Sequence, residues 1–361
     1  MKILDELFHR EQYSMPPEEK NSLLLDELWD LTRFHAEKCP EYNNIIRKIY
    51  RGLNSKPEGL EQLPYFPVRL FKLINLKSIP DTDVMRTLAS SGTTSMQVSR
   101  IFVDRDTSML QTRALASIVT SFIGPKRLPM LIVDTDASIS RASLSARGAG
   151  LVGLSNFGRN HFYALNEKME LNMTGVLEFV EKYGNEPVLL FGFTFMVWQN
   201  FYSELKKHNI KLNLDKGILI HSGGWKKLQD IAVGNEQFKT ALREQCGIER
   251  VHNFYGMVEQ VGSIYMECEH SYLHAPNFSD IITRNFHDWC ETGTGETGVI
   301  QTMSVLPRSY PGHSILTEDI GIIHGRDGCP CGRRGTYFTV EGRIPQAELR
   351  GCSDVYADGN L

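Results

Sequence analysis

Ser90-Ser91-Gly92-Thr93-Thr94-Ser95 is a loop rich in hydroxyl groups, and the rest of the chain can be interpreted outward from it. It follows residues 86–89, which are typical of the end of a strand. Such a loop can direct several backbone N–H and side-chain O–H groups at one anion, and Gly92 permits a tight turn close to a ligand. The loop therefore predicts a phosphate site. An ordinary solvated turn is the alternative, and no Gly-Lys-Ser/Thr of a Walker loop follows.

Composition and charge exclude several classes of protein. The chain has 361 residues, with 39 basic and 43 acidic side chains and a formal charge of −4. This length predicts two or three packed units, and the lack of a basic excess argues against nucleic-acid binding. The longest apolar runs, 129–133 and 188–191, are too short to span a membrane. Because the N-terminus lacks a signal-peptide pattern and seven cysteines lack disulfide-scaffold spacing, we expect a cytoplasmic, reduced protein.

Short apolar runs alternate with helical patterns through the middle of the chain. Helical patterns cover 16–38, 106–122 and 173–183. The runs expected to be strands are 130–133, 188–191, 217–220 and 251–254. This alternation favours an α/β fold of layered sheets and helices. From about residue 265, strand-like runs joined by glycine-rich turns predict a smaller β-rich subdomain.

Two glycine-containing segments each come directly after an expected strand. They are His221-Ser222-Gly223-Gly224-Trp225 and Tyr255-Gly256-Met257-Val258-Glu259. The carboxyl end of a strand is where α/β sheets bind ligands. Tyr255 offers a flat ring for an adenine, and Glu259 offers a carboxylate for Mg²⁺. Taken alone, each segment is equally compatible with an ordinary turn.

Two further segments place charged side chains at expected turns. In Leu316-Thr317-Glu318-Asp319-Ile320-Gly321, the aspartate can accept both hydroxyls of a ribose or form a simple Asx-turn. In Val340-Glu341-Gly342-Arg343-Ile344, the Gly-Arg pair ends an expected strand. Its guanidinium can face a ribose or a phosphate at a hinge, and a surface hairpin is the alternative.

Each of these signals is weak, but their order and spacing are specific. A hydroxyl-rich loop, Gly-Gly, Tyr-Gly-x-x-Glu, Thr-x-Asp and Gly-Arg in this order resemble the adenylate-forming superfamily of acyl-CoA synthetases and adenylation domains. The resemblance runs from about Phe66 to Cys352. Within the superfamily the chain is most similar to the LuxE-like acyl-protein synthetases, with phenylacetate-CoA ligases as the next relatives. That closer similarity is carried by 66–72, Ser91-Gly92-Thr93, Gly223-Gly224-Trp225-Lys226 and Gly351-Cys352.

The resemblance implies a role for each motif. It implies that the 90–95 loop holds the phosphates of ATP and that Gly223, Gly224 and Tyr255-Gly256 border the adenine. It further implies that Glu259 binds Mg²⁺, that Asp319 holds the ribose, and that Arg343 lies at the ribose and the hinge. Val258 departs from the pattern, because the superfamily usually has a threonine there that contacts the acyl phosphate.

The segment after Arg343, residues 344–361, is too short for a domain, which typically needs at least ~50 residues. We therefore expect the C-terminal lid domain of the superfamily to be absent and the segment to be a flexible tail. In the LuxE-like family, the cysteine at the position of Cys352 receives the acyl group as a thioester and passes it to a reductase. Arg350 can favour the nucleophilic thiolate. A chance cysteine in a frayed terminus is the alternative.

Four residues form a pattern typical of a zinc site. Cys329-Pro330-Cys331-Gly332 resembles a zinc knuckle, and Cys268 and His274 lie upstream, with His270 as a competing ligand. Three thiolates and one imidazole suit tetrahedral Zn²⁺, and some phenylacetate-CoA ligase relatives share the arrangement. We expect a structural zinc that ties the β-rich subdomain to the 255–259 segment. Free thiols in a hairpin are the alternative.

Together these features predict four regions: a helical region packed on the core at 1–85, an α/β nucleotide-binding core at 86–264, the β-rich subdomain at 265–343 and the tail at 344–361. The leading hypothesis is an ATP-dependent acyl-protein synthetase that activates a hydrophobic carboxylic acid. The acyl group passes to Cys352 and on to an acyl-CoA-reductase-type partner. One alternative is a truncated acyl-CoA ligase that delivers the acyl group to CoA, a carrier protein or an amine. Another is a non-catalytic nucleotide-binding subunit.

Overall fold

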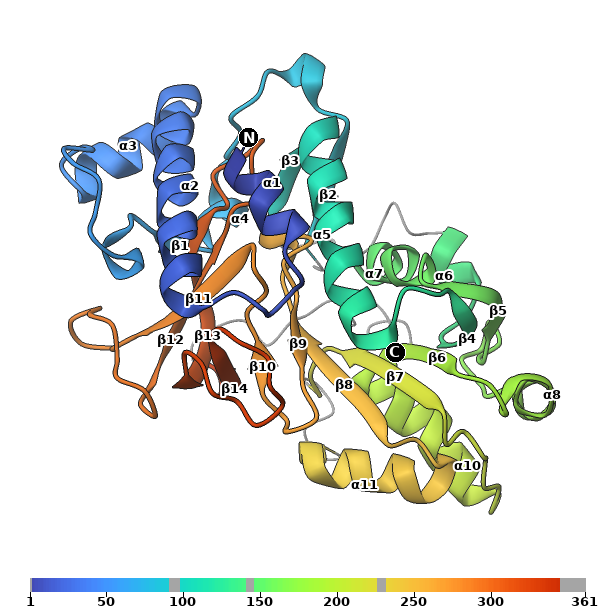
Figure 1. Ribbon diagram of the computed structural model, residues 1–361. Helices are drawn as coiled ribbons and strands as arrows, with labels where there is room; N and C mark the ends of the chain where they lie inside the picture. The colour runs from blue at the N-terminus through green and yellow to red at the C-terminus, as the bar shows by residue number, and fades with distance from the viewer. Residues whose placement is uncertain (1, 91–97, 141–145, 226–231, 345–361) are drawn as a thin grey trace.

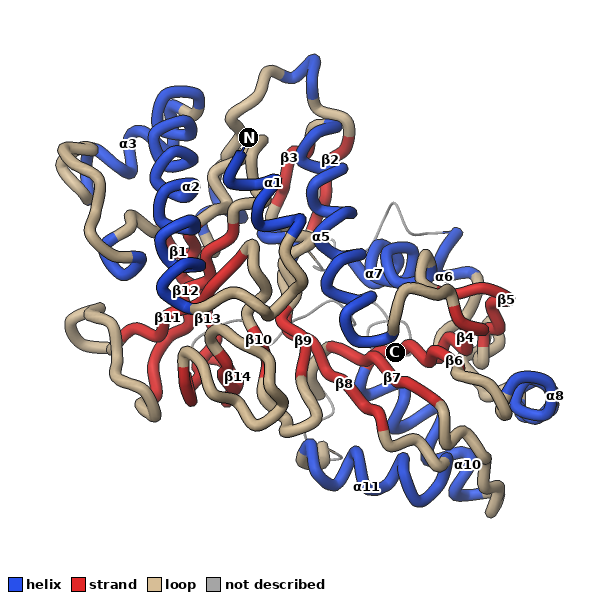
Figure 2. Tube along the Cα trace, viewed as in Figure 1, coloured by secondary structure: helices blue, strands red, loops and turns tan. Residues whose placement is uncertain are grey.

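The fold was analysed in a computed structural model that describes residues 2–90, 98–140, 146–225 and 232–344. A 12-stranded sheet runs through the described residues, with helices on both of its faces (Figure 1). A separate hairpin of two strands lies beside it. Figure 2 shows strands and helices alternating along the trace as the sequence predicts. The α/β fold class is therefore confirmed.

The N-terminal region consists mainly of helices. Its longest helix begins directly after Pro16 with Pro17 in the first turn, where a proline's missing N–H costs nothing. Leu24, Leu28 and Leu31 form its buried stripe. The elements of this region are α1 (Lys2–His9), α2 (Pro17–Lys38), α3 (Pro40–Ile49), β1 (Phe66–Pro67) and α4 (Leu70–Leu73), with 3₁₀ turns at Leu60–Gln62 and Asp81–Asp83.

The middle of the chain alternates strands and helices. The N-terminus of α5 is capped by Asp104, whose side chain accepts a hydrogen bond of 2.8 Å from the N–H of Thr107. The elements are β2 (Arg86–Ala89), β3 (Arg100–Val103), α5 (Arg105–Ile123), β4 (Leu128–Val133), α6 (Ala137–Ser140), α7 (Ala146–Ser155), β5 (Gly158–Tyr163), α8 (Met173–Tyr183), β6 (Val188–Phe193), α9 (Thr194–Met196), a π-helix (Val197–Tyr202), α10 (Ser203–Lys207), β7 (Gly217–Ser222), α11 (Asn235–Cys246) and β8 (Arg250–Tyr255).

The last third of the described chain is mostly strands. A 3₁₀ turn at Val258–Gln260 leads into β9 (Tyr265–Glu267), β10 (Leu273–His274), β11 (Ser279–Arg284), β12 (Thr297–Ser304), β13 (Ser314–Gly325) and β14 (Tyr337–Arg343). These strands continue the sheet of the α/β core, because β9 pairs with β8. The order along the sheet is β11-β12-β13-β14-β10-β9-β8-β7-β6-β4-β5, and β1 pairs with β13.

The sheet has a buried layer on each face. In β4, Met130 and Ile132 belong to one core, which includes residues of α1, α2, α5 and α7. Leu131 and Val133 of the same strand belong to a second core with residues of α8 and α11. Strands covered on both faces read as continuous apolar runs, which explains why β4, β6 and β7 could be predicted from sequence. None of the described helices is long and apolar enough to cross a bilayer.

Candidate functional site

Three of the residues assigned to nucleotide binding meet at one place in the sheet. Tyr255 ends β8, Asp319 lies within β13, and Arg343 ends β14. The hydroxyl of Tyr255 donates a hydrogen bond of 2.7 Å to Oδ2 of Asp319. Nε of Arg343 donates one of 3.2 Å to Oδ1 of the same carboxylate. Asp319 is thus held by two donors, and each oxygen keeps a further lone pair with which it can accept a ligand hydroxyl.

The backbone around Asp319 corrects one sequence expectation. The predicted turn at 317–319 is wrong, because these residues lie inside the long strand β13, where β14 pairs Asp319 with Arg343. The register shifts between Ile320 and Gly321. A glycine, which is typical of turns, occurs here because the bulge brings two strands close together. A Cβ on Gly321 would lie 2.5 Å from the carbonyl oxygen of Thr339. The bulge changes the direction of the strand next to Asp319.

The ring of Tyr255 packs against other aromatic rings at the sheet. Its centroid lies 6.0 Å from that of Tyr265 and 6.4 Å from that of Phe338. Burial, and then the adjacent Asp319 carboxylate, raise the pKa of Tyr255 well above its ordinary value. The hydroxyl therefore stays protonated and acts as a donor to Asp319.

Gly223 and Gly224 lie at the carboxyl end of β7, next to the end of β8. Ser222, the last residue of β7, pairs with Phe254, and its hydroxyl donates a hydrogen bond of 3.0 Å to the carbonyl of Phe254. Gly223 has φ +85°, which favours glycine, and both glycines are exposed. Gly223 and Tyr255 are the residues that directly follow the Ser222–Phe254 pair, and Gly256 follows Tyr255. The two glycines therefore expose backbone at the same edge of the sheet as Tyr255.

Glu259 is a buried carboxylate in the 3₁₀ turn after β8. Burial raises its pKa, whereas the hydroxyl of Ser99 and the charges of Lys72 and Arg343 lower it. Arg343 thus acts on both Glu259 and Asp319. A carboxylate oxygen is the kind of ligand that Mg²⁺ binds in proteins.

The residues that flank the hydroxyl-rich loop are hydrogen-bonded to each other, although most of the loop lies outside the described residues. Residues 91–95 and Cys352 lie outside the described residues. Ser90 and Ser99 are described, and they bridge the two ends of the loop. The N–H of Ser90 donates to the carbonyl of Ser99 at 3.1 Å, and the N–H of Ser99 donates to the hydroxyl of Ser90 at 2.9 Å. The side chain of Ser99, at the second of these ends, lowers the pKa of Glu259.

Ser99 and Lys72 influence Glu259 but were not assigned a role from the sequence motifs. Ser99 is fully buried at the end of the loop. Lys72 belongs to α4, far from the other motifs in sequence. The available signals were a hydroxyl directly before the second strand of the hairpin and the 66–72 segment that contributes to the family resemblance.

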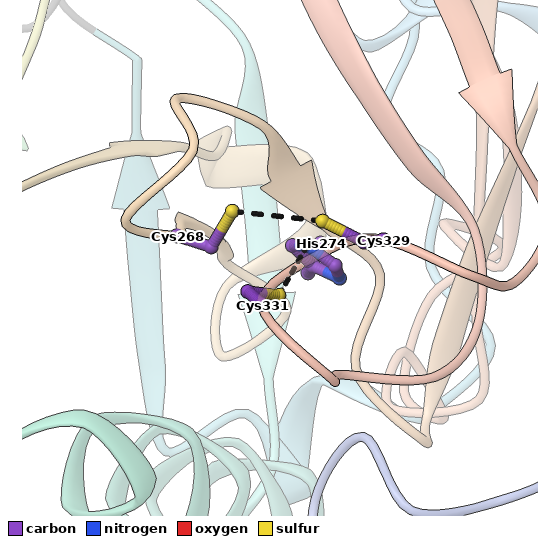
Figure 3. A group of neighbouring side chains, drawn as sticks. All are labelled: Cys268, His274, Cys329 and Cys331. Carbon is purple, nitrogen blue, oxygen red and sulfur yellow. Dashed lines mark hydrogen bonds between the residues drawn. The ribbon is translucent and has the colours of Figure 1, made fainter.

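The four predicted metal ligands form a second cluster in the same sheet. Cys268 follows β9, His274 ends β10, and Cys329 and Cys331 lie in the connection between β13 and β14. Their ligand atoms all lie within 4.8 Å of one another. Figure 3 shows the three sulfur atoms and the imidazole gathered around one point. His270 is exposed and does not belong to the cluster.

The spacing within the cluster fits a tetrahedral ion. Sγ of Cys268 lies 3.9 Å from Sγ of Cys329, and Sγ of Cys331 lies 3.4 Å from Nε2 of His274. Tetrahedral zinc with bonds of about 2.3 Å to sulfur and about 2.0 Å to nitrogen separates two sulfurs by about 3.8 Å and a sulfur from a nitrogen by about 3.5 Å. Backbone N–H groups of His270 and Arg333 donate to Cys268 and Cys331 at 3.4 and 3.5 Å. Such donors stabilise thiolate ligands.

The protonation of the cluster also suits a cation. Burial, with the charge of Arg333, lowers the pKa of His274 to about 3, so the imidazole is neutral and able to coordinate. Burial raises the pKa of Cys329 to about 12, and the nearby Cys331 and Cys268 add to the rise. Crowded, buried thiols ionise when a metal ion neutralises them.

Comparison with known proteins places the chain among one group of ligases. The family described as "Acyl-protein synthetase, LuxE" matches residues 1–359. A long-chain-fatty-acid–luciferin-component ligase of Aliivibrio fischeri is 23% identical over 296 residues, which are 80% of this chain and 76% of the relative. The protein with the same name in Vibrio harveyi is 21% identical over 330 residues, 89% of this chain and 84% of the relative.

Solved structures share the fold. An open conformation of 2-hydroxyisobutyryl-CoA ligase in complex with 2-HIB-AMP and CoA matches with a TM-score of 0.69 and 15% identity, covering 92% of this chain and 77% of that one. ATP-bound MatB from Rhodopseudomonas palustris matches with a TM-score of 0.50 and 15% identity, covering 74% and 49%. Because the family match extends over nearly the whole sequence, the chain belongs to the LuxE family of acyl-protein synthetases.

Proposed function

We propose that the chain activates a long-chain fatty acid with ATP and transfers the acyl group to Cys352 and then to a partner protein. The observation that carries the proposal is the convergence of Tyr255 and Arg343 on the carboxylate of Asp319. Arg343 also acts through its charge on the buried carboxylate of Glu259. The names of the relatives, which are long-chain-fatty-acid ligases, support the choice of substrate.

The first step overcomes the poor reactivity of a carboxylate. A carboxylate oxygen attacks the α-phosphorus of ATP, the bond from that phosphorus to the bridging oxygen breaks, and pyrophosphate leaves. Asp319 would hold the ribose, with its orientation fixed by Tyr255 and Arg343. Gly223 and Gly224 would border the adenine. Mg²⁺ held by Glu259 would neutralise charge on the phosphates.

The second step moves the acyl group to sulfur. The thiolate of Cys352 attacks the acyl carbon, the carbon–oxygen bond to phosphate breaks, and AMP leaves. The thioester then reacts with a nucleophile on the partner, for which we propose an acyl-CoA-reductase-type protein. Thioester chemistry at a free cysteine requires a reducing compartment, so we place the protein in the cytoplasm.

Intact-mass analysis after incubation with ATP, Mg²⁺ and a panel of fatty acids tests this function. The wild-type protein should release pyrophosphate only when acid is present and should gain the mass of one acyl group, which hydroxylamine removes. Cys352→Ser should release pyrophosphate without retaining the acyl group. Cys290→Ser is the matched control, because Cys290 is exposed and lies in a loop of the β-rich region.

Other outcomes select the alternatives. Acyl-CoA formation that does not need Cys352 would indicate a CoA ligase. ATP binding without acid-dependent pyrophosphate release would indicate a non-catalytic subunit.

We also propose that the cluster of Cys268, His274, Cys329 and Cys331 holds a structural Zn²⁺. Three thiolates and one imidazole occupy all four tetrahedral positions, which is typical of structural rather than catalytic zinc. The ion would connect the β9–β10 hairpin to the β13–β14 connection.

A further inference from the structure

The 66–72 segment contributes to the family resemblance, and the charge of its last residue, Lys72, acts on Glu259. In the structure it runs beside the strand that carries Asp319. Phe66 and Pro67 of β1 pair in parallel with Ile315 and Leu316 of β13. The N–H of Val68 extends this pairing with a hydrogen bond of 2.8 Å to the carbonyl of Leu316. The start of α4 is therefore fixed relative to the nucleotide site.

Phe71 fixes the orientation of α4. Its side chain is 1% exposed, and its ring lies 5.5 Å from that of Phe66 and 6.1 Å from that of Tyr310. The same core contains Ile101 and Val103 of β3, the strand that begins directly after Ser99. With Phe71 held in this core, the next residue, Lys72, is half-buried at the margin of the site.

Two cations act on Glu259, and their surroundings differ. Arg343, at the end of β14, also donates a hydrogen bond to Asp319. Lys72 lies in α4, which follows β1 in the N-terminal part of the chain. An ammonium group on a flexible four-carbon stem can follow charge that moves during a reaction, whereas a guanidinium bound to Asp319 is held in place. Lysines are confined to the first 239 residues of this sequence, and Lys72 is the lysine whose charge acts on Glu259.

Adenylation brings two anions together, the carboxylate of the acid and the α-phosphate of ATP. A positive group at the point where they meet lowers the barrier because the developing charge is neutralised in a partly desolvated site. We propose that Lys72 is a catalytic residue of adenylation, whose ammonium group contacts the reacting carboxylate and the α-phosphate. It keeps its protons throughout: the new oxygen–phosphorus bond forms, the bond to the pyrophosphate breaks, and the lysine changes neither charge nor oxidation state.

This assignment rests on the proposed function, and separating the two half-reactions tests it. The variant is Lys72→Met, which keeps the length of the stem and removes the charge. Lys77→Met is the matched control, because Lys77 pairs with Asp81 and lies over the ring of Phe102. The measurements are acid-dependent pyrophosphate release, acyl transfer from chemically prepared acyl adenylate, the dissociation constant of MgATP, and the thermal midpoint.

We expect Lys72→Met to lower the rate constant of pyrophosphate release by at least about 100-fold. Acyl transfer from the preformed adenylate and the thermal midpoint should stay close to those of the wild type, and MgATP affinity should fall by a much smaller factor than the rate. Lys72→Arg should recover part of the rate, and Lys77→Met should behave as the wild type.

Two results would overturn the assignment: pyrophosphate release by Lys72→Met at the wild-type rate, or an equal loss in both half-reactions, which would indicate a structural role. Wild-type protein that releases no pyrophosphate with any acid would overturn the proposed function itself, and this assignment with it.

Discussion

Replacing Cys331 with serine should remove the metal ion and loosen the β-rich part of the sheet. The ion would join Cys268 to Cys329, which are 61 positions apart. Closing a loop of that length lowers the entropy of the unfolded chain by an amount worth about 4 kcal/mol at 25 °C. For a chain of 361 residues, the average entropy of unfolding converts this loss to a fall in the melting temperature of about 5 °C.

The assay combines metal analysis with thermal unfolding. Wild-type protein purified in the presence of zinc should carry one zinc ion per chain, as measured by inductively coupled plasma mass spectrometry. Cys331→Ser should carry little, and its melting temperature should fall by about the predicted 5 °C. A chelator should lower the melting temperature of the wild type to that of the variant. The chelator can reach the ion, because Cys331 borders a surface hollow of about 700 Å³ that Arg333 and His270 also line.

Cys290→Ser is the control, because that thiol is exposed and lies outside the cluster. It should keep both the zinc content and the melting temperature of the wild type. Wild-type protein that binds no zinc after reconstitution would contradict this prediction. Loss of zinc from Cys331→Ser with no change in melting temperature would contradict it equally, since the ion would then not be cross-linking the strands.

Three further predictions concern polar groups in the fold. Tyr255→Phe removes the hydroxyl that donates to Asp319 and should cost about 1–2 kcal/mol of unfolding free energy; AMP affinity should fall in parallel, as calorimetry would show, and unchanged affinity would contradict the assigned ribose site. Burial lowers the pKa of His313 to about 3, so the unfolded chain takes up a proton near pH 6.5 that the folded protein resists. The contribution of His313 to the free energy of unfolding is fully present above that pH and falls by about 2 kcal/mol by about pH 5. Urea titrations should show a smaller fall in the free energy of unfolding for His313→Gln, and an equal fall would refute this prediction. Lys20 and Asp280 form a buried ion pair, 2% and 3% exposed, so Lys20→Met should destabilise by about 3–5 kcal/mol in chemical denaturation; the double variant Lys20→Met/Asp280→Leu should recover part of that loss.

Much of the α/β core could be predicted because its strands are buried on both faces. The runs at 188–191 and 217–220 extend by two residues each in β6 (Val188–Phe193) and β7 (Gly217–Ser222). The helix predicted at 173–183 has the same bounds as α8. Apolar runs bounded by turn residues give a strong signal when both faces are covered.

The antiparallel part was harder to predict, and the error at 317–319 shows why. Thr317 uses its hydroxyl to donate to the carbonyl of Ile300 at 2.8 Å, and the N–H of Asp319 donates back to that hydroxyl at 3.1 Å. Hydroxyl and carboxylate side chains that bond to nearby backbone are typical of turns. Here they stabilise a bulged strand, and only the pairing with β12 and β14 distinguishes the two.

The residues of the proposed nucleotide site also differ in how well the sequence identifies them. Tyr255 and Arg343 could be assigned because each ends a strand in a recognisable motif. Ser99 and Lys72 could not, because their relation to Glu259 depends on the β2–β3 hairpin and on the pairing of β1 with β13, which join distant parts of the sequence. The assignments of Ser91–Ser95 and Cys352 fall outside the described residues and stay predictions.

The Cys/His cluster and the proposed nucleotide site belong to one network of paired strands, so an ion in the cluster would have a role beyond stability. β9 pairs with β8 so that Tyr265 faces Tyr255, and β10 pairs with β14 at His274 and Tyr337. β13 and β14 in turn align Asp319 with Arg343. An ion that joins Cys268 and His274 to the β13–β14 connection therefore fixes, through hydrogen-bonded neighbours, the strands that bring Tyr255 and Arg343 to the same carboxylate. If that is so, loss of the metal should weaken AMP binding even where the protein stays folded, and a metal-free protein with unchanged AMP affinity would show that the sheet alone sets the geometry of the site.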